Sequence, residues 1–353
     1  MKERRVSVVL PVLDAVQHVE TAVRSVLQPE TLEVLVVDGG STDGTLEVIR
    51  RLELEDARVR LLPQHGKGLV AALNQGCRAS RGAFIARMDA DDLSLPRRFA
   101  RQVAFLEANQ AVGLVGSFLL VVGEGDKPRY VRRYPCDPAL IGWSLNFGCC
   151  LAHGTILARR DLLAEGPYDV AARHAEDFDL WQRLSRRHRL ANLPEPLVLR
   201  RDLPSTVSRR HARDQAVVAA RVVHRALQET LGRPIDPQTA TCLANALSGM
   251  AADTTRIPDA ARLLMEARQR FESQARRPVR SDVADRLGLL AMAAIRGGRP
   301  LTGFRLLILA FRQSPGRALR RGLELATGRL PERARGAALR KAVRRFAHAT
   351  SSA

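Results

Sequence analysis

Three carboxylates stand close together in the segment Met88–Asp92, whose sequence is MDADD. Asp89, Asp91 and Asp92 repel one another, so they stay ionised together only where solvent or a cation neutralises them. Hard divalent ions such as Mg²⁺ and Mn²⁺ prefer oxygen ligands and leave room for substrate phosphates. The segment directly follows an apolar run that predicts a buried strand. This position favours a metal site over a solvated turn.

A second polar loop, Asp38–Thr45, has the sequence DGGSTDGT and also follows an expected strand. Its glycines let backbone N–H groups approach a ligand closely, and Asp38 can accept a hydrogen bond from a base or a ribose. The structural alternative is a tight turn in which Asp43 caps the next helix. We expect Asp43 to have this capping role and Asp38 to contact a ligand.

A third group of acids, Glu176, Asp177 and Asp179, opens an amphipathic pattern that predicts a helix over 177–188. Acidic residues suit the N-terminus of a helix because of its dipole, which is the structural interpretation. In the functional interpretation, one of these carboxylates reaches the site as a general base.

The elements that must position these loops alternate between strand and helix over the first 120 residues. In the first helix we expect Asp14 to be the N-cap and Gln17 its capping-box partner. The alternation predicts an α/β fold with a doubly wound, mostly parallel sheet, which binds ligands at the carboxyl ends of its strands. The expected strands lie at 6–10, 32–37, 59–62, 84–88 and 112–122, and the helices at 14–27, 45–54, 69–79 and 96–109.

The pattern changes twice after residue 122. Over 123–200 it is mixed, with a hairpin turn expected at 123–127 and a strand at 151–157. Beyond residue 210 it is helical to the end, so we expect an α/β domain over 1–210 and an all-helical region over 211–353. A 42-residue offset within the helical region suggests a duplicated helical hairpin. It aligns Leu247, Met250, Ala251, Ala252, Pro258 and Leu264 with Leu289, Met292, Ala293, Ala294, Pro300 and Leu306.

The helical region carries most of the charge. The 353 residues have a formal net charge of +19, of which 1–210 contribute +4 and 211–353 contribute +15. Nucleic-acid binding is disfavoured because aromatic residues make up only 4%. Contact with anionic lipid is favoured, and a solvated arginine-rich face is the alternative. The densest basic cluster is Arg317, Arg320, Arg321, Arg329, Arg333, Arg335, Arg340, Lys341, Arg344 and Arg345, against Glu324 and Glu332.

The cysteines and the apolar runs bear on location. The five cysteines form no CxxC pair, which favours reduced thiols. The first apolar run is interrupted by Pro11 and stopped by Asp14, so it predicts a strand rather than a signal peptide. No stretch approaches the roughly 20 apolar residues of a spanning helix. We therefore expect a cytoplasmic protein, with peripheral contact at the inner face of the membrane.

Taken together, the polar segments resemble glycosyltransferase family 2, which has the GT-A fold and includes inverting enzymes. The family's V-D-D-G-S-T-D loop is similar to residues 37–43, its M-D-A-D-D loop matches residues 88–92 throughout, and its E-D-x-D-L-W segment matches residues 176–181. Between them, residues 72–76 (ALNQG) resemble A-L-N-x-G, and residues 153–155 (HGT) resemble H-x-T. The order and spacing also agree, and the resemblance covers roughly residues 5–210.

The resemblance implies a role for each acidic segment. Asp38 would contact the nucleobase of a nucleotide-sugar donor, with a UDP-sugar expected first. Asp89 and Asp91 would hold the ribose and a divalent metal, Mn²⁺ or Mg²⁺, with Asp91 the more direct metal ligand. Asp177 would deprotonate the hydroxyl of a saccharide or lipid-linked acceptor, with Glu176 as the second candidate.

Other residues are weaker candidates under the same resemblance. His153 would assist the metal or the diphosphate, or act as a structural hydrogen-bonding group. Lys67 and Arg87 would meet phosphate oxygens or lie on a solvated face. Pro11 and Leu13 would border the donor. Leu13 stands where the family often has an aromatic residue, so it cannot stack on a base.

The other departure from the family pattern is Gly39, which replaces a carboxylate near the nucleoside. Neither departure touches the metal loop or the base, so we expect an active transferase in cell-surface polysaccharide or glycolipid assembly. The alternatives are an inactive nucleotide-sugar-binding scaffold that recruits a synthesis complex through its helical tail, a nucleic-acid binder and a nucleotidyltransferase. The last usually has a glycine-rich basic loop after the first strand, which this chain lacks.

Overall fold

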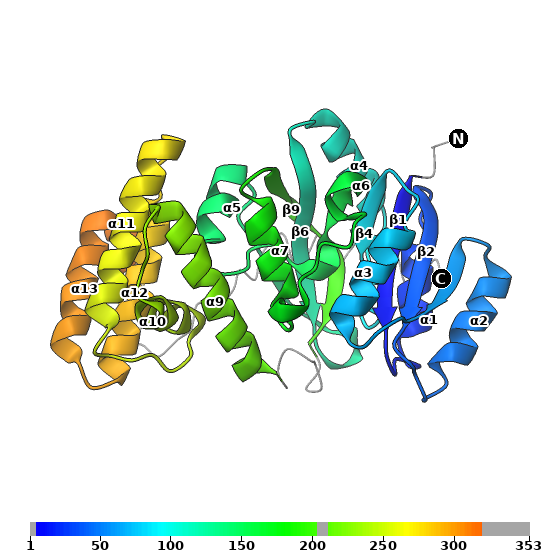
Figure 1. Cartoon of the computed structure of the whole chain (residues 1–353), viewed down its shortest axis with the longest axis horizontal. Coiled ribbons are helices and arrows are strands. Elements are labelled where there is room, and N and C mark those ends of the chain that lie inside the picture. The colour runs from blue at the N-terminus through cyan, green and yellow to red at the C-terminus, as the bar shows by residue number, and fades with distance from the viewer. Residues whose placement is uncertain (1–4, 203–210, 320–353) are drawn as a thin grey trace. The chain divides into compact units, whose positions relative to one another are not determined.

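The computed structural model describes residues 5–202 and 211–319, and these residues divide into two units. Residues 5–141 and 150–202 make up the first, which we call the α/β unit. Residues 142–149 and 211–319 make up the second, which we call the helical unit. Figure 1 labels the elements of both.

The α/β unit contains a nine-stranded sheet in the described residues, in the order β3-β2-β1-β4-β8-β6-β9-β5, with β7 paired to β6. Strands β3, β2, β1 and β4 run parallel, as do β6 and β9, whereas β8, β7 and β5 pair antiparallel. The expected α/β fold is confirmed, and its sheet is parallel on the side where the polar loops begin. The strands are β1 (Val6–Val12), β2 (Thr31–Asp38), β3 (Val59–Pro63), β4 (Phe84–Arg87), β5 (Leu93–Ser94), β6 (Val112–Val122), β7 (Pro128–Arg132), β8 (Leu157–Arg159) and β9 (Arg189–Arg201).

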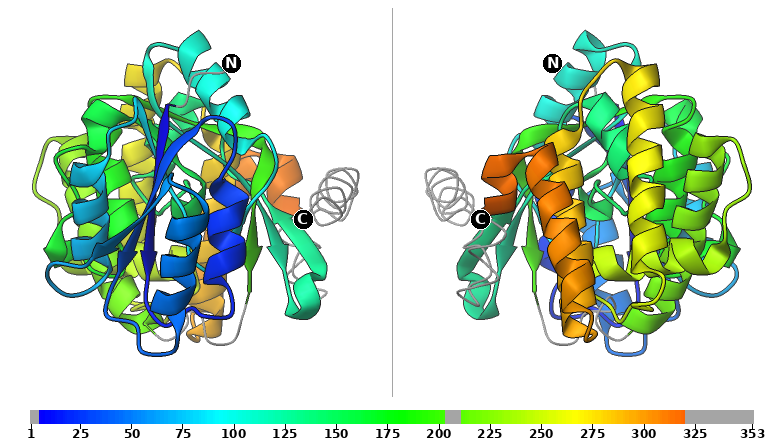
Figure 2. Two further views of the ribbon diagram at one scale, coloured as in Figure 1. Left: turned by 90° about the vertical axis from the view of Figure 1, so that its right-hand side faces the viewer. Right: turned by 90° about the vertical axis from the view of Figure 1, so that its left-hand side faces the viewer.

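Helices cover both faces of this sheet (Figure 2). Alternate residues of β1, including Val8 and Leu10, join a core with α1, α2 and α4. Val9 points to the other face, where a Cβ on Gly76 would lie 2.4 Å from its Cγ1 atom. Only a glycine therefore lets α3 pack this closely on β1. The helices of this unit are α1 (Val19–Val26), α2 (Thr45–Glu55), α3 (Leu69–Ala79), α4 (Arg98–Ala108), α6 (Arg160–Leu163) and α7 (Glu176–Leu184). Helix α5 (Pro138–Ser144) begins in the α/β unit, and its last residues belong to the helical unit.

Two local expectations were wrong, and one strand was not expected. Helix α1 begins at Val19, and Asp14 is not its N-cap. Asp14 has a φ of 47° and accepts a hydrogen bond from the Thr42 amide at 2.8 Å, so its carboxylate supports the neighbouring loop. The strand expected over 151–157 is largely a 3₁₀ turn, η2 (His153–Thr155), and β8 starts only at Leu157. The strand β9, for which no expectation was made, pairs with β6 along its length.

The helical unit contains two hairpins at the 42-residue offset that the repeat predicted. Helices α10 and α11 form the first, and α12 and α13 the second, with Leu264 and Leu306 buried at corresponding positions. Trp143 packs within the same unit, its ring centroid 5.2 Å from that of Phe271. The helices are α9 (Ala212–Leu231), α10 (Pro237–Ser248), α11 (Ile257–Ala275), α12 (Arg280–Arg296) and α13 (Pro300–Gln313).

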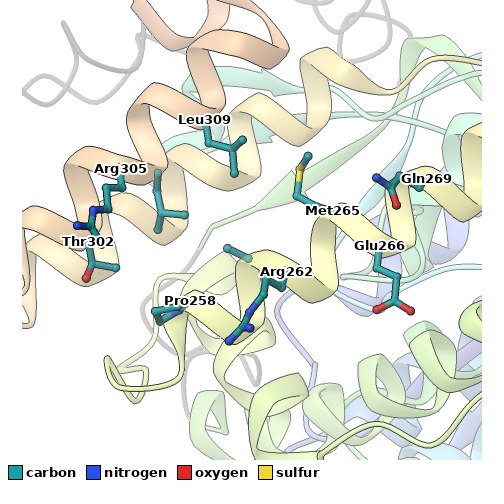
Figure 3. A pocket seen from close by; sticks show the side chains of 10 residues that line it. Pro258, Arg262, Met265, Glu266, Gln269, Thr302, Arg305 and Leu309 are labelled. Carbon is teal, nitrogen blue, oxygen red and sulfur yellow. The ribbon is translucent and has the colours of Figure 1, made fainter.

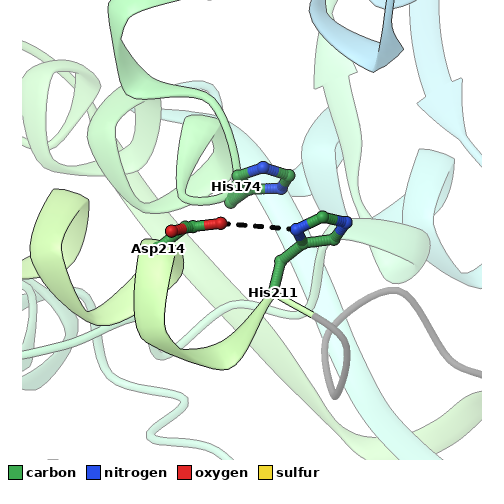
Figure 4. A group of neighbouring side chains, drawn as sticks. All are labelled: His174, His211 and Asp214. Atoms are coloured by element: carbon green, nitrogen blue, oxygen red, sulfur yellow. Dashed lines mark hydrogen bonds and ion pairs between the residues drawn. The ribbon is translucent and has the colours of Figure 1, made fainter.

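The surface of the helical unit is rich in exposed charge. At the start of α9, His211 Nδ1 lies 3.4 Å from Asp214 Oδ2 (Figure 4), an exposed pair that contributes little to stability. Of the C-terminal basic cluster, the structure describes Arg317, which pairs with Asp285 at 3.2 Å, and the other members lie outside the described residues. Among the helices that the structure describes, none is long and apolar enough to cross a membrane.

Candidate active site

The acidic segment Met88–Asp92 follows β4 at the carboxyl edge of the parallel strands, as predicted. Asp89 is half-exposed and forms an ion pair with Arg87, while Asp92 is buried. The end of β9 holds this loop: the Arg201 amide donates to Asp92 Oδ1 at 3.2 Å, and Arg201 Nη1 donates to the Asp91 carbonyl at 2.8 Å. A strand not expected from the sequence therefore fixes the shape of the most acidic loop.

The carboxylates of this loop oppose one another's ionisation. Burial raises the pKa of Asp91, and the charge of Asp89 raises it further. Burial raises the pKa of Asp92 well above its ordinary value, with added repulsion from Asp89 and Asp91. A cation among these oxygens would relieve the repulsion, and a set of carboxylate oxygens is the donor set that Mg²⁺ and Mn²⁺ prefer. The residues present therefore fit a divalent metal.

Two buried arginines lie beneath the loop. Arg98 is fully buried, and its Nη2 donates to the carbonyls of Arg87 and Ile156 at 3.0 and 3.2 Å. Burial lowers the pKa of Arg98 to about 9, and the charge of Arg87 adds to this effect. Burial also works to lower the pKa of Arg87, but the charge of Asp89, its hydrogen bond and smaller contributions from Tyr168 and Glu176 together outweigh burial, and the pKa is raised. The sequence did not predict a role for Arg98. A single arginine at the start of a helix is usually exposed, so its residue type gives no signal of burial.

The turn η2 brings His153 and Gly154 beside the acidic loop. A Cβ on Gly154 would lie 3.0 Å from Asp89 Oδ2, so the glycine permits this approach. His153 Nε2 lies 2.9 Å from the Tyr168 hydroxyl. Burial lowers the pKa of His153 well below its ordinary value, and the charge of Arg87 lowers it further. The imidazole is thus neutral near pH 7, which is the form that binds a metal or accepts a hydrogen bond.

The first turn of α7 presents Glu176 and Asp177. Glu176 is buried, and burial together with the charge of Asp177 raises its pKa to about 7. Asp177 is half-buried, and its Oδ1 accepts from the Phe178 amide at 2.7 Å. Of the two carboxylates, Asp177 is therefore the more accessible to a second substrate.

Asn74 on α3 holds the segment that precedes α7 through two hydrogen bonds. Asn74 Nδ2 donates to the Tyr168 carbonyl at 2.9 Å, and the Tyr168 amide donates back to Asn74 Oδ1 at 3.0 Å. The asparagine of the ALNQG segment therefore positions the chain that leads to α7. The sequence had shown this residue only as part of a family pattern.

The carboxylate of Asp38 stabilises the loop that follows β2 by accepting hydrogen bonds from that loop. Asp38 Oδ2 accepts from the Gly40 amide at 2.9 Å, and Oδ1 accepts from the Ser41 hydroxyl at 2.5 Å. Gly40 has a φ of 95°, which favours glycine in this turn. Asp43 supports the start of α2 by accepting from the Thr45 amide at 3.0 Å, although the N-cap position itself is Gly44.

The other expected donor-binding residues border the same edge. Pro11 lies near the end of β1, opposite Val37 of β2, and Leu13 follows with 60% of its surface exposed. Lys67 is exposed between two glycines in the loop after β3. Gln64 Nε2 stabilises that loop by donating to the Gly68 carbonyl at 2.8 Å.

Comparisons with known proteins agree with this architecture. Residues 7–165 match the family model described as "Glycosyl transferase family 2". These residues belong to glycosyl transferase family 2. The family 2 domain thus contains the loops after β2 and β4 and the turn η2, while α7 lies beyond the matched range.

Curated relatives are similar over about half of this chain. An uncharacterized glycosyltransferase of Haemophilus influenzae is 28% identical over 55% of this chain, which spans 64% of that relative's length. The UDP-Glc:alpha-D-GlcNAc-diphosphoundecaprenol beta-1,3-glucosyltransferase WfgD of Escherichia coli is 26% identical over 51% of this chain and 70% of its own. The crystal structure of S. aureus TarS in complex with UDP is 15% identical, with a TM-score of 0.51 over 93% of both chains. This likeness confirms the GT-A fold expected for the family 2 domain.

Proposed function

We propose that the protein is an inverting, divalent-metal-dependent glycosyltransferase that moves a sugar from a nucleotide-sugar donor to a hydroxyl acceptor in cell-surface polysaccharide or glycolipid assembly. The observation that carries the proposal is the acidic loop after β4, held beside η2 at the carboxyl edge of the parallel strands of a family 2 domain. We assign catalysis to a domain over residues 1–210 and a separate, basic helical region to 211–353.

The donor is proposed to lie along the edge formed by the ends of β1, β2 and β4. Asp38 and Asp89 would contact the nucleoside, with Pro11, Leu13 and Lys67 bordering it. A UDP-sugar is favoured because TarS is described in complex with UDP and WfgD is named for UDP-Glc. Leu13 offers an apolar surface to the base but no aromatic ring, so stacking contributes less here than an aromatic side chain would provide.

Asp91 and Asp89 would hold the metal, with His153 as a further ligand or as a support for the diphosphate. The ion would neutralise the negative charge that builds on the departing nucleoside diphosphate. Arg201 keeps the loop in shape by binding the Asp91 carbonyl. The neutral imidazole of His153 is held in place through the Tyr168 hydroxyl.

Asp177 would act as the base. Its carboxylate takes the proton of the acceptor hydroxyl, whose oxygen then bonds to the anomeric carbon on the face opposite the departing diphosphate. The bond between that carbon and the diphosphate oxygen breaks in the same displacement, so the anomeric centre inverts. Glu176 is the second candidate, and its burial makes it less able to meet an acceptor.

The acceptor is proposed to be a saccharide or a lipid-linked saccharide. WfgD is named for a diphosphoundecaprenol acceptor, which supports the lipid-linked class. The excess of basic residues over 211–353 supports a peripheral contact with a membrane that holds such an acceptor.

The test is calorimetry of the full chain with a panel of nucleotide sugars, with and without Mn²⁺. We expect binding of one donor that requires the metal and is lost in Asp91→Ala. Asp161→Ala, which removes an exposed aspartate from α6, is the matched control and should bind as the wild type does. Absence of binding to every donor with any metal would contradict the proposal. Binding without sugar transfer to any acceptor would favour the alternative function, a nucleotide-sugar-binding scaffold.

A further inference from the structure

Helix α13 carries a row of large apolar side chains on its exposed face. Leu301, Phe304, Ile308 and Phe311 are 78%, 62%, 43% and 47% exposed. Their spacing of three, four and three residues puts them on one face of the helix. We call these four residues the α13 stripe. A contiguous exposed apolar surface of this kind marks a binding surface more often than scattered apolar residues do.

The opposite face of α13 fixes the orientation of the stripe. Gly303, Leu306 and Ala310 are buried there. A Cβ on Gly303 would lie 2.4 Å from Ile295 Cγ1 of α12, so the two helices pack at a distance that only glycine permits. Because this face of α13 packs on α12, the stripe points away from α12. A rotation of α13 that buried the stripe would break this packing.

The charges of α13 are of one sign. Its charged residues are Arg305 and Arg312, both exposed and without an ion-pair partner among the described residues. Arg305 also lines a cavity of about 480 Å³ between α11 and α13, together with Arg262 and the apolar side chains of Met265 and Leu309 (Figure 3). The lining also includes Glu266, which pairs with Arg233. The stripe itself is bordered by arginine on α13.

Charge complementarity decides what covers the stripe. A second copy that docked through the same stripe would bring its own Arg305 and Arg312 against these arginines, which is unfavourable. The segment 320–353 contains nine Lys+Arg and two Asp+Glu, so it has the same sign as α13. An anionic lipid surface has the opposite sign and also accepts apolar side chains.

We propose that α13 binds an anionic lipid bilayer, with the α13 stripe inserted at the boundary between headgroups and acyl chains. This inference deepens the membrane contact in the proposed function and rests on it. The helix has 14 residues, too few to span a bilayer, so it would lie in the plane of the interface with Arg305 and Arg312 at the headgroups.

The test is sedimentation of the full chain with vesicles of phosphatidylcholine alone or of phosphatidylcholine and phosphatidylglycerol in equal parts. We expect binding to the anionic vesicles, reduced about tenfold or more in Phe304→Glu/Phe311→Glu. The matched control is Leu54→Glu in α2, which changes a side chain that is 90% exposed outside the stripe. It should bind as the wild type does.

A tryptophan in the stripe gives a second readout. Trp143 and Trp181 are fully buried, so their emission forms a constant background. In Phe304→Trp we expect a blue shift of the added emission with anionic vesicles and none with neutral ones. A shift of equal size with both vesicles would contradict the role of charge.

Three results would overturn the proposal. The first is that the wild type does not sediment with anionic vesicles. The second is that Phe304→Glu/Phe311→Glu sediments as well as the wild type does. The third is that light scattering shows a dimer which this variant dissociates, because that result assigns the stripe to a second copy of the chain. Nucleotide-sugar binding, measured by calorimetry on the same variants, keeps a failure here distinct from a failure of the transferase proposal.

Discussion

The two units differ in whether they bury charged side chains. The α/β unit buries Arg98 completely and leaves the side chain of Glu33 only 1% exposed. In the described part of the helical unit, the buried polar residues are Asn146, Thr230 and Thr239, and none of these is charged. Burying a charge is costly unless it is paired or hydrogen-bonded. The α/β unit bears that cost where it shapes the acidic loop and the sheet edge, whereas the helical unit relies on alanine and leucine packing.

Each unit also has its own tryptophan, which makes the comparison measurable. Trp181 packs among the rings of His153 and Tyr168 in the α/β unit. Trp143 packs on Phe147 and Phe271 in the helical unit. Replacing one of the two with phenylalanine leaves a single fluorescent reporter for the other unit.

The largest effect is expected at the proposed base. Asp177→Asn should lower kcat by about 10²–10⁴-fold, because the amide cannot take the acceptor's proton. The dissociation constant of the donor should stay unchanged. Transfer rates and calorimetry on the same preparation check both values.

Asp161→Asn is the control for Asp177→Asn, since it makes the same chemical change at an exposed position of the α/β unit. Retention of more than a tenth of kcat in Asp177→Asn would remove this residue as the base. Glu176 would then be the carboxylate to test.

A substitution that creates a cavity in the helical unit should lower the free energy of unfolding through lost packing. Leu264 is fully buried in α11, and Leu264→Ala should lower the free energy of unfolding by about 2–5 kcal/mol. Denaturant unfolding followed by Trp143 in a Trp181→Phe background measures this. Donor binding should persist at low denaturant.

The exposed residue Leu54 provides the contrast to Leu264. Leu54→Ala should change the free energy of unfolding by less than about 0.5 kcal/mol. Equal effects of the two substitutions would mean that burial in α11 does not stabilise the helical unit.

The features that could be predicted depend on repeated patterns or on residues that are close together in the sequence. The alternation of apolar runs and helical periods predicted β1, β2 and α3 closely, because it follows from burial on each face. The position of the MDADD loop after β4 followed from the same alternation. The spacing of the helical hairpins also followed, since a proline lies within the first two residues of both α11 and α13.

The features that were missed depend on partners distant in sequence. Strand β9 gave no helical or alternating signal that stood out, yet it pairs with β6 and its Arg201 holds the acidic loop. Asp14 has the type and place of an N-cap, but the loop after β2 supplies a competing donor at Thr42. Local propensity cannot weigh a partner 28 residues away.

Glu33 tests the cost of a buried charge directly. Its carboxylate accepts from the Ser7 hydroxyl at 2.7 Å and from the Arg81 amide at 2.8 Å, and it pairs with Arg60. Burial works to raise its pKa, but these donors outweigh burial and the pKa is lowered. Glu33→Gln should lower the free energy of unfolding by about 1–3 kcal/mol near pH 7, because one donor then faces an NH₂ group.

The pH dependence of that loss has a defined sign. The pKa of Glu33 is lower in the folded state, so its charge stabilises the fold above the ordinary value of 4.5, and this contribution is lost as pH falls through the folded-state pKa. The difference between wild type and Glu33→Gln should therefore shrink as unfolding is measured from about pH 7 down to about pH 4. A difference that is the same at both ends would mean that shape, not charge, is what Glu33 provides.

The smallest effect is expected at Glu176, a carboxyl whose charged form the α/β unit disfavours. Its pKa of about 7 means that it ionises as pH rises through neutrality. A negative Glu176 raises the proton affinity of its neighbour Asp177, so kcat of the wild type should rise through about pH 7. Glu176→Gln should remove this inflection while changing kcat near pH 7 by less than about tenfold. The same carboxyl should lower the free energy of unfolding as pH rises from 4.5 to about 7, because the fold disfavours its charged form. A pH profile of kcat that keeps its inflection in Glu176→Gln would assign the ionisation near neutrality to another group.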